Sequence, residues 1–358
     1  MTEMTRLRAP LVAALALILL PAAAAKGLRS ELSVRPAGAR GPLVQYDLAH
    51  AAKRFALPAG MLSADGTRFV FVRGRKLTFY SVVGRRAYLD AQVAAGSSVE
   101  AVSPEARLVV LRSGAQARLV DGVHGKTVTT LTLPSGFTVD ALAPDGHWLY
   151  LIQHKGGQAY AVRRYNLRTG VLATDPLVQK GEQEQMAGTA AGAIQSRDGE
   201  WQFTLYVNRA ERMAFVHALN LEYSYTVCID LPGHGTPAEL RTYALAASPD
   251  GKHVYAANPA LGLVQDFALD GFRALSKRFA AAAGARSASA AVAPSGRTLA
   301  FSGGSRVWLY DTVTGTARGP YSAGGNVVGL GFADARRLFA ARSNGRLTAV
   351  DATTGKRD

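Results

Sequence analysis

A short phrase built around a tight turn recurs seven times along the chain, at intervals of 39 to 53 residues. Its copies begin at Ser63 (SADGTRFVFV), Ser103 (SPEARLVVL), Ala143 (APDGHWLYLI), Ser196 (SRDGEWQFTLY), Ser248 (SPDGKHVYAA), Ala293 (APSGRTLAF) and, in degraded form, Phe332 (FADARRLFAA). Similarity at such a period is the signature of a repeat architecture, in which each unit buries its apolar side against the next. The chain is therefore expected to form one ring of similar units rather than several unrelated domains.

The chemistry of one unit predicts four antiparallel strands. Pro-Asp-Gly presets φ, offers a side-chain bond to the backbone and supplies a left-handed position, so it closes a hairpin. The segment before the turn, such as SSVEAVS, is short, small and largely apolar, and the segment after it is an apolar strand. A second phrase, such as VWLYDTVTGT or LTAVDATTGK, then joins a third strand to an outer fourth. Four strands per roughly 45 residues form a propeller blade, so the fold class is all-β: a seven-bladed β-propeller with four-stranded antiparallel blades.

The two ends of the chain suggest how the ring closes. The last unit stops at Asp358, after its third strand and turn, and lacks an outer strand. The segment GPLVQYDLAHAAKRFALP, residues 41–58, has no unit of its own. We expect this N-terminal segment to pair into the last blade and close the ring, with one strand or two, so that no sheet edge stays open. The propeller would then span residues 41–358, and residues 26–40 would form a flexible linker.

The first residues predict export. Arg6 and Arg8 precede the apolar run LVAALALILL, which Pro21 and four alanines follow. A positive flank, a short apolar run and a small-residue exit describe a secretory signal peptide, here residues 1–25. We expect a secreted or envelope-located protein after Sec-type cleavage, and the alternative is an uncleaved anchor. Cys228 is the single cysteine, so no intrachain disulfide can form, and its setting in TVCIDL indicates an inert thiol within a strand.

The repeated phrase SPDGKHVYAAN, followed by a Val-rich strand and Asp-x-x-Thr-Gly, resembles the YVTN-type and WD-repeat-like seven-bladed propellers of exported bacterial proteins. The resemblance covers residues 41–358. It implies the ring fold but little about activity, because such rings include lactonases, subunits of redox enzymes and binding scaffolds. The Gly-His…Trp-Asp signature of true WD repeats is missing. The three tryptophans lie within strands, unlike the docking tryptophans of quinoprotein dehydrogenases.

Propeller geometry places the loops on two faces. The Pro-Asp-Gly and Asp-x-x-Thr-Gly turns lie on one face, here called the turn face. The second-to-third-strand loops and the blade connections lie on the other, the loop face, where related propellers usually bind. Ten cations fall in the second-to-third-strand loops against one acid, Glu211: Arg73, Arg75, Lys76, Arg112, Lys155, Arg209, Arg212, Arg306, Arg342 and Arg346. With the uncharged Asn258, they form the predicted ligand-binding face.

This charge bias has two interpretations. It can form a positive funnel that attracts an anionic small molecule, an envelope polyanion or an acidic protein partner. It can equally reflect polar loops that carry the surplus of a chain with net charge +15. Nucleic acid is not expected as a partner, because the export signal removes the chain from it and no aromatic platform accompanies the arginines.

Four residues are candidates for acid–base or metal chemistry at the channel mouth. Glu182 and Glu184 lie in the longest blade connection, and His154 and His234 fall on the same face. Their spacing matches no metal-ligand motif, and a solvated surface loop is the alternative for the two glutamates. No metal and no cofactor are expected, because the chain contains no G-x-S-x-G, H-E-x-x-H, G-x-G-x-x-G or P-loop motif. The sequence thus favours a monomeric binding or scaffold protein, with a lactonase-like hydrolase and a structural envelope subunit as alternatives.

Overall fold

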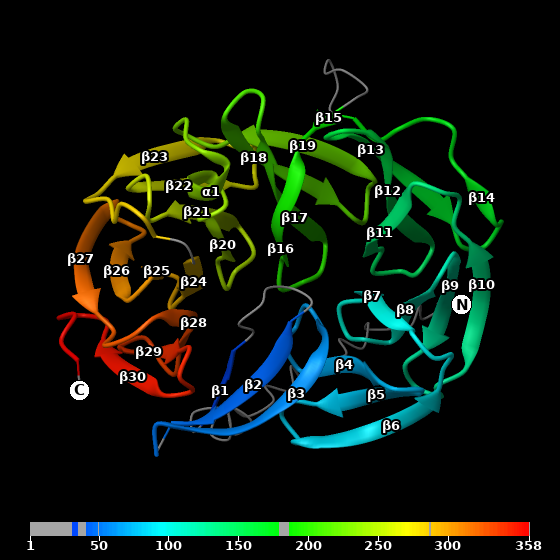
Figure 1. Cartoon of the computed structure of the whole chain (residues 1–358), viewed down its shortest axis with the longest axis horizontal. Coiled ribbons are helices and arrows are strands. Elements are labelled where there is room, and N and C mark those ends of the chain that lie inside the picture. Colours follow the sequence, from blue (N-terminus) through cyan, green and yellow to red (C-terminus); the bar gives the residue numbers. More distant parts are fainter. Residues whose placement is uncertain (1–30, 35–40, 49, 179–185, 286–287, 358) are drawn as a thin grey trace, which may run out of the picture.

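The computed structural model is a ring of seven β-sheets arranged as blades around a central channel (Figure 1). It describes residues 31–34, 41–48, 50–178, 186–285 and 288–357. The described part of the chain holds no helix with the length and hydrophobicity that a membrane crossing needs. The predicted fold class, an all-β seven-bladed propeller, is confirmed.

Each blade runs from an inner strand beside the channel to an outer strand at the rim. The first blade consists of β3 (Ala52–Leu62), β4 (Arg68–Arg73), β5 (Lys76–Ser81) and β6 (Arg86–Gln92). The second consists of β7 (Ser98–Val102), β8 (Leu108–Ser113), β9 (Gln116–Asp121) and β10 (Thr127–Thr132). The third consists of β11 (Phe137–Leu142), β12 (Trp148–Gly156), β13 (Ala159–Asn166) and β14 (Val171–Leu172), with β15 (Met186–Ala187) also paired to β13.

The remaining blades follow the same order around the ring. The fourth consists of β16 (Thr189–Gln195), β17 (Trp201–Asn208), β18 (Met213–Asn220) and β19 (Tyr225–Asp230). The fifth consists of β20 (Ala244–Ala247), β21 (His253–Asn258), β22 (Leu263–Ala268) and β23 (Ala274–Arg278), preceded by the short helix α1 (Pro237–Leu240). The sixth consists of β24 (Ala288–Val292), β25 (Thr298–Gly303), β26 (Arg306–Asp311) and β27 (Thr316–Ser322). The seventh has three strands, β28 (Val327–Phe332), β29 (Arg337–Arg342) and β30 (Leu347–Asp351).

The repeated phrase is the hairpin turn between the first and second strands of each blade. In the fifth blade the Ser248 hydroxyl accepts a hydrogen bond from the His253 amide (2.9 Å) and donates one to Asp250 (2.5 Å). Gly251 then takes a left-handed φ of 72°, which costs glycine little. The second blade lacks this glycine, and Ala106 adopts φ 50° in its place. The turn is thus conserved in shape within the ring even where its residues change.

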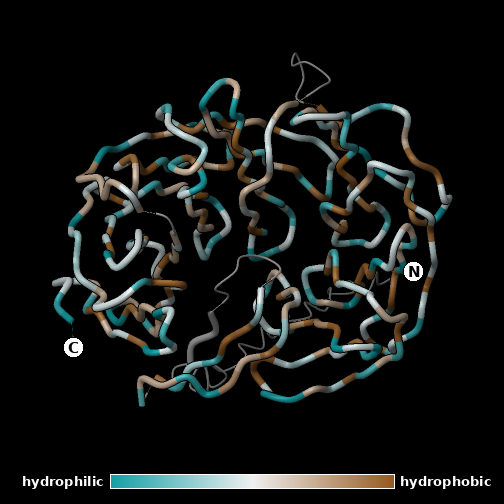
Figure 2. Tube along the Cα trace, viewed as in Figure 1, coloured by the Kyte–Doolittle hydropathy of each residue, from teal (hydrophilic) through white to brown (hydrophobic). Residues whose placement is uncertain are grey.

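The core is divided among the interfaces between neighbouring blades. Each interface has its own cluster of buried apolar side chains; in the cluster between blades five and six, for example, Val264 of the fifth blade packs with Phe301 and Trp308 of the sixth. Burial of such side chains removes apolar surface from water and holds blade to blade. Figure 2 shows hydrophobic residues concentrated along the blades, with hydrophilic residues frequent at the turns and the rim.

The N-terminal segment lies between the first and last blades, but among the described residues its backbone pairing to the last blade is limited to one isolated bridge, between Ala52 and Arg346. Strand β2 (Pro42–Asp47) is hydrogen-bonded to β1 (Glu31–Val34) and to β3, in the sheet of the first blade. Its side chains alternate: Leu43 packs on the first blade, whereas Val44 and Tyr46 pack on the seventh. The segment is therefore a wedge at the seam of the ring (Figure 1) rather than an outer strand of the last blade.

This arrangement also alters the predicted linker, residues 26–40. Within it, residues 31–34 form β1, and the rest of the linker lies outside the described residues. The predicted signal peptide, residues 1–25, lies outside them as well.

Candidate functional site

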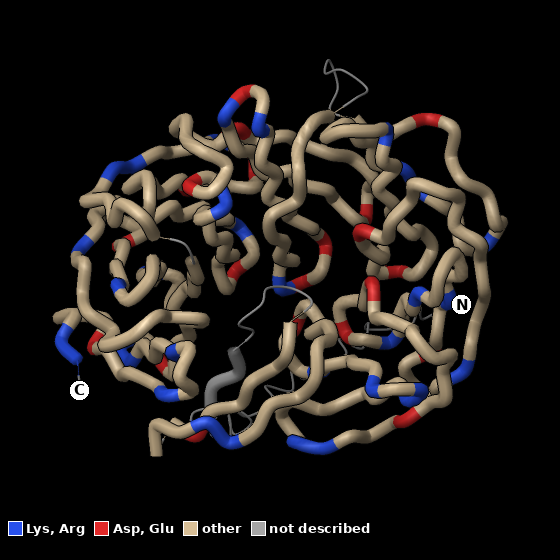
Figure 3. The backbone as a smooth tube through the Cα atoms, viewed as in Figure 1, with Lys and Arg blue, Asp and Glu red and all other residues tan. Residues whose placement is uncertain are grey.

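The structure places the ten predicted cations of the loop face around the ring. They come from every blade except the fifth, so they encircle the channel instead of clustering at one point. Figure 3 likewise shows Lys and Arg spread around the ring with Asp and Glu between them. Seven of the ten are exposed and form no ion pair with a described residue: Arg73, Arg75, Lys155, Arg209, Arg212, Arg306 and Arg346.

The other predicted loop-face residues are engaged within the protein. Lys76 pairs with Asp90 (2.8 Å), and Arg342 donates to the Gly324 carbonyl (3.1 Å). Asn258 is fully buried. Its amide accepts hydrogen bonds from the Leu261 amide and the Thr242 hydroxyl and donates to the Glu239 carbonyl. Asn258 thus shapes its loop from inside and offers no surface to a ligand, contrary to its expected place on the binding face.

A cavity of about 870 Å³ opens at the loop face between blades three and four. The cavity is flanked by the inner strands of these two blades, β11 and β16. Each of them lies close to the inner strand of its other neighbour, β11 to β7 and β16 to β20. The pair β11 and β16 is not among the closely contacting pairs of described strands. The gap between these two inner strands gives the cavity its width. Four chemically active side chains line it, namely Glu100, Arg112, Asp140 and His154.

Two of these side chains are carboxylates on adjacent inner strands. Glu100 in β7 and Asp140 in β11 each occupy the extra residue of a β-bulge, where the strand register shifts from 99 to 101 and from 139 to 141. A bulge redirects a side chain and is common beside functional sites. The Ser98 hydroxyl donates to Glu100 (2.6 Å), and the Glu100 side chain is largely buried. Both carboxylates therefore line the cavity on a rigid part of the scaffold.

Arg112 is held in a fixed position at the same cavity. Its Nε donates to the Gly114 carbonyl (2.9 Å), and its Nη1 donates to the Phe137 carbonyl of the next blade (3.2 Å). A guanidinium carries five N–H groups, so this anchoring leaves donors for a ligand. The fixed cation and the two carboxylates make the cavity amphoteric, in contrast to the predominantly basic funnel expected from the loops.

The inner wall of the cavity is aromatic and hydroxyl-bearing. Tyr160 stacks on Tyr206 with ring centroids 4.4 Å apart, and burial raises the pKa of both phenols well above the usual value. These groups are therefore neutral hydroxyls at physiological pH. Thr204 also lines the cavity; its Oγ1 is buried and has no hydrogen-bond partner among the described residues. A buried hydroxyl without a partner is costly, and a bound ligand could satisfy it.

Behind this wall lies His217, which packs edge-on against Tyr160 and Tyr206. Full burial lowers the pKa of its imidazole to about 4, so the ring is neutral at pH 7. Cys228, its neighbour across β18 and β19, is half-buried and contacts the Met186 sulfur at 3.8 Å. The thiol thus packs in the interface between blades, in a strand as the sequence indicated.

The four predicted acid–base candidates do not form a described cluster. His154 lines the cavity and bonds Thr138 through its Nε2 (3.1 Å), whereas His234 is exposed in the connection before α1 and is not part of the cavity lining. Glu182 and Glu184 lie outside the described residues. Within the described ranges, no three His, Cys, Asp or Glu side chains come together as a metal-binding group.

The sequence reasoning missed Glu100 and Asp140, although a signal was present. Both residues lie three positions before the first residue of the repeated turn phrase, which is Ser103 in the second blade and Ala143 in the third. The other five repeats carry Gly60, Ala193, Leu245, Ala290 and Gly329 at this position. A single acid in an otherwise small or apolar inner strand cannot be explained by packing, so comparison of the repeats could have identified both carboxylates.

No family model matches the chain, and no curated protein matches it by sequence. Solved structures do resemble it. One is "Dihydro-heme d1 dehydrogenase NirN in complex with DHE" (15% identity, 92% of this chain and 72% of that chain, TM-score 0.54). Another is "KlHsv2 with loop 6CD replaced by a Gly-Ser linker" (12% identity, 82% of this chain and 91% of that chain, TM-score 0.51). The β-propeller domain of Myceliophteria thermophila Cps50 (Swd1) also matches (12% identity, 82% of this chain and 96% of that chain, TM-score 0.49).

These likenesses concern the fold. Identities of 12 and 15% leave the activity open, and of the two neighbours with a TM-score above 0.5 one is named a dehydrogenase. A propeller ring is compatible with a binding or scaffold role. The narrower resemblance to YVTN-type and WD-repeat-like proteins stays a prediction.

Proposed function

We propose that this chain is an exported binding propeller that takes a small polar anion in the cavity between blades three and four. The observation that carries the proposal is the convergence of the anchored Arg112 with Glu100 and Asp140 in one cavity of about 870 Å³. A concave site of this size with a few fixed polar groups is the usual form of a small-molecule site. Export rests on the N-terminal pattern of Arg6, Arg8 and the apolar run after them.

The charges of the cavity restrict the chemistry of the ligand. The guanidinium of Arg112 suits a carboxylate or a similar planar anion, which accepts two parallel hydrogen bonds. Glu100 and Asp140 would repel a second negative charge and instead accept hydrogen bonds from hydroxyl or amino groups. The ligand class is therefore a monoanion that also carries several donors, such as a sugar acid, a hydroxy acid or an amino acid.

The exposed loop cations would act before the ligand enters the cavity. Seven exposed Lys and Arg side chains that form no ion pair with a described residue create a positive potential that raises the rate of encounter with anions. Such attraction between exposed charges is screened at high ionic strength. The same ring of cations can dock an acidic protein partner or an envelope polyanion, which are the larger partners that the sequence predicted.

A thermal-shift screen tests the proposal on the full chain without its first 25 residues. The panel contains gluconate, glycerate and glutamate at 10 mM, with glucose as a neutral ligand that carries hydroxyl donors and sulfate as an anion without such donors. We expect an increase in melting temperature with at least one donor-bearing acid and little change with glucose or sulfate, since a ligand that binds the native state stabilises it. The result that overturns the proposal is no shift with any member of the panel.

Variants then locate the binding site of the acid that raises the melting temperature. Arg112→Gln and Glu100→Gln should each reduce its affinity at least tenfold by calorimetry, because each leaves a ligand group without its partner. Arg306→Gln, at an exposed cation of another blade, is the matched control and should change affinity less than threefold. If Arg306→Gln weakens binding as much as Arg112→Gln does, the ligand is held by the loop surface and the cavity is not the site.

A further inference from the structure

A second cavity, of about 490 Å³, lies in the channel at the turn face. It shares Met61, Ala193 and Gln202 with the cavity of the loop face, so the two adjoin along the channel. Its lining is mostly apolar or small and includes Leu62, Leu245, Val292 and Phe332. Arg197 is the one charged residue among the described residues that line it.

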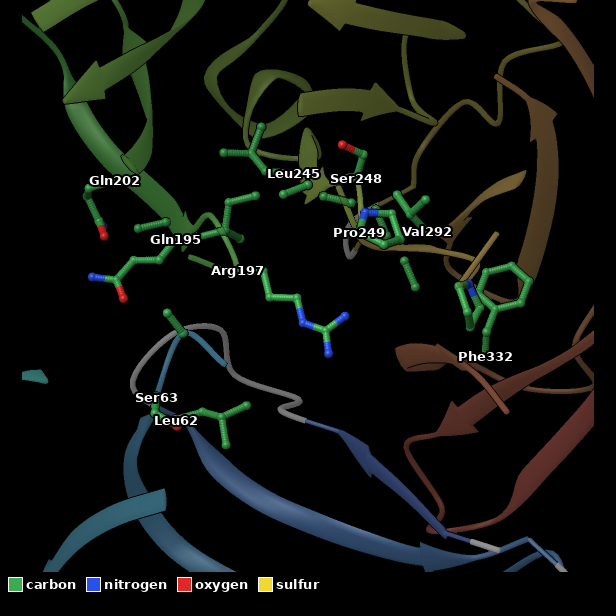
Figure 4. Close-up of a pocket in the computed structure, with 18 of the residues that line it drawn as sticks. Leu62, Ser63, Gln195, Arg197, Gln202, Leu245, Ser248, Pro249, Val292 and Phe332 are labelled. Atoms are coloured by element: carbon green, nitrogen blue, oxygen red, sulfur yellow. The ribbon is translucent and has the colours of Figure 1, made fainter. Parts of the chain in front are cut away.

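Figure 4 shows how Arg197 enters this space. Its side chain extends from the first turn of blade four into the open centre, with Leu62, Leu245, Pro249, Val292 and Phe332 around it. The guanidinium is solvent-exposed, and it forms no ion pair with any described residue. The arginine thus presents its charge to the cavity rather than to another part of the fold.

The repeats of the ring show that the turn does not require this arginine. The position that follows the first turn residue is proline in blades two, three, five and six, and alanine in blade one: Pro104, Pro144, Pro249, Pro294 and Ala64. Pro249, Pro294 and Ala64 line the same cavity from their own blades. Proline presets the φ of this turn position and lowers the entropy of the unfolded chain. Blade four gives up this advantage, and in the part of the chain that the structure describes the arginine gains no ion pair in return.

The acids nearby are engaged within their own turns. Asp198 accepts hydrogen bonds from the Ser196 hydroxyl (2.5 Å) and the Glu200 amide (3.0 Å). Asp250 of the next blade is bonded to Ser248 (2.5 Å) and to the Lys252 amide (3.1 Å). These bonds hold both carboxylates in place, so the guanidinium of Arg197 stays available to an incoming anion.

We propose that the turn-face cavity binds an organic carboxylate with an apolar body, and that Arg197 holds the carboxylate. The guanidinium pairs with two carboxylate oxygens through parallel hydrogen bonds. The aliphatic and aromatic walls remove the apolar body of the ligand from water, which is favourable in proportion to the area buried. This site is distinct from the cavity between blades three and four, and neither Arg112 nor Glu100 lines it.

Octanoate is the probe, and 1-octanol is its uncharged counterpart. Calorimetry on the wild-type chain should show octanoate binding at least tenfold more tightly than 1-octanol, because the alcohol lacks the charge that Arg197 pairs with. No octanoate binding at millimolar concentration overturns the proposal. Equal affinity for the acid and the alcohol also overturns it, since the site would then be an apolar cavity without anion recognition.

The decisive variant is Arg197→Pro, which restores the residue of the other repeats. It should lose octanoate binding at least tenfold while its melting temperature stays the same or rises, because proline fits this turn. Arg197→Gln is the second variant if the proline variant fails to fold. Arg297→Gln, at an exposed arginine of the turn face that does not line the cavity, is the control and should bind as the wild type does. Octanoate binding that survives both Arg197 variants refutes the role of this residue.

The outcome is separable from that of the proposed function. Arg197→Pro should leave the response to sugar, hydroxy or amino acids unchanged, and Arg112→Gln should leave octanoate binding unchanged. Loss of both ligands in either variant would show that the two cavities act as one site and would contradict the assignment of a distinct turn-face site.

Discussion

Acidification should destabilise the protein through His217. The imidazole is fully buried against Tyr160 and Tyr206, next to Thr204 and Cys228 on the neighbouring strands. Its Nε2 has no hydrogen-bond partner among the described residues. A proton on this ring would place a positive charge between two blades, away from water. The pKa therefore falls from the ordinary 6.5 to about 4 in the folded protein.

The sign and size of the effect follow from linkage. Below pH 6.5 the unfolded chain binds a proton at His217 that the folded chain does not bind until the pH approaches 4, so stability is lost as the pH falls through this window. One pKa unit corresponds to about 1.4 kcal/mol. Between pH 7 and pH 4.5 the contribution amounts to about 2.4 kcal/mol, a large part of a typical stability of about 5–15 kcal/mol.

The assay is urea unfolding of wild type and His217→Leu at pH 7 and pH 4.5, followed by tryptophan fluorescence. Other groups also titrate in this range, so the informative quantity is the difference between the two proteins in their loss of stability. We expect the variant to lose about 2 kcal/mol less than wild type on acidification, whatever its stability at pH 7. His234→Asn, at an exposed histidine, is the control and should follow the wild type. Parallel losses in wild type and His217→Leu, within about 0.5 kcal/mol, would refute the reasoning.

Two further substitutions test the fold. Ser248→Ala should cost about 1–2 kcal/mol in urea unfolding, because it leaves the His253 amide and Asp250 without the hydroxyl that joins them, whereas Ser305→Ala in an exposed loop should cost little. Equal costs would show that the hydroxyl is not what holds the turn. Tyr46→Ala should cost about 3–5 kcal/mol, because its side chain is 2% exposed and packs against Phe339 and Leu347 of the last blade. A cost below about 1 kcal/mol would show that the β2 wedge contributes little to the seam of the ring.

The ring itself could be predicted from sequence because each blade specifies its own turn. Asp311 shows how local this information is: its carboxylate accepts hydrogen bonds from the Val313 and Thr314 amides, two and three residues ahead. A turn of this kind needs no partner from elsewhere in the chain. Seven such units in series then leave one arrangement that buries all the blade faces, a closed ring.

The seam could not be predicted in the same way. Tyr46-Asp47 repeats the pattern of Tyr310-Asp311, so it marks a strand, but a strand pattern does not name the partner of the strand. Leu43, Val44 and Tyr46 are all buried, on both sides of β2. A run that is apolar on both sides fits an inserted wedge and a paired strand equally well. The choice between them depends on the width of the gap between the first and last blades, which is a property of the closed ring.

Loop composition reveals neither of the two proposed sites, whereas comparison of the repeats points to both. The cations of the loop face are conspicuous in the sequence, yet the structure spreads them around the ring and leaves most of them exposed without a described partner. The residues that converge are departures from the repeat at positions facing the channel: Glu100 and Asp140 where other blades have small or apolar residues, and Arg197 where they have proline or alanine. Each departure gives up something that the fold favours, either an apolar inner strand or a rigid turn. Because the seven units share one geometry, the six others show what stability alone requires at that position. In a ring of repeats, a charged residue that breaks the pattern toward the channel is therefore stronger evidence for a binding site than an excess of charge on the loops.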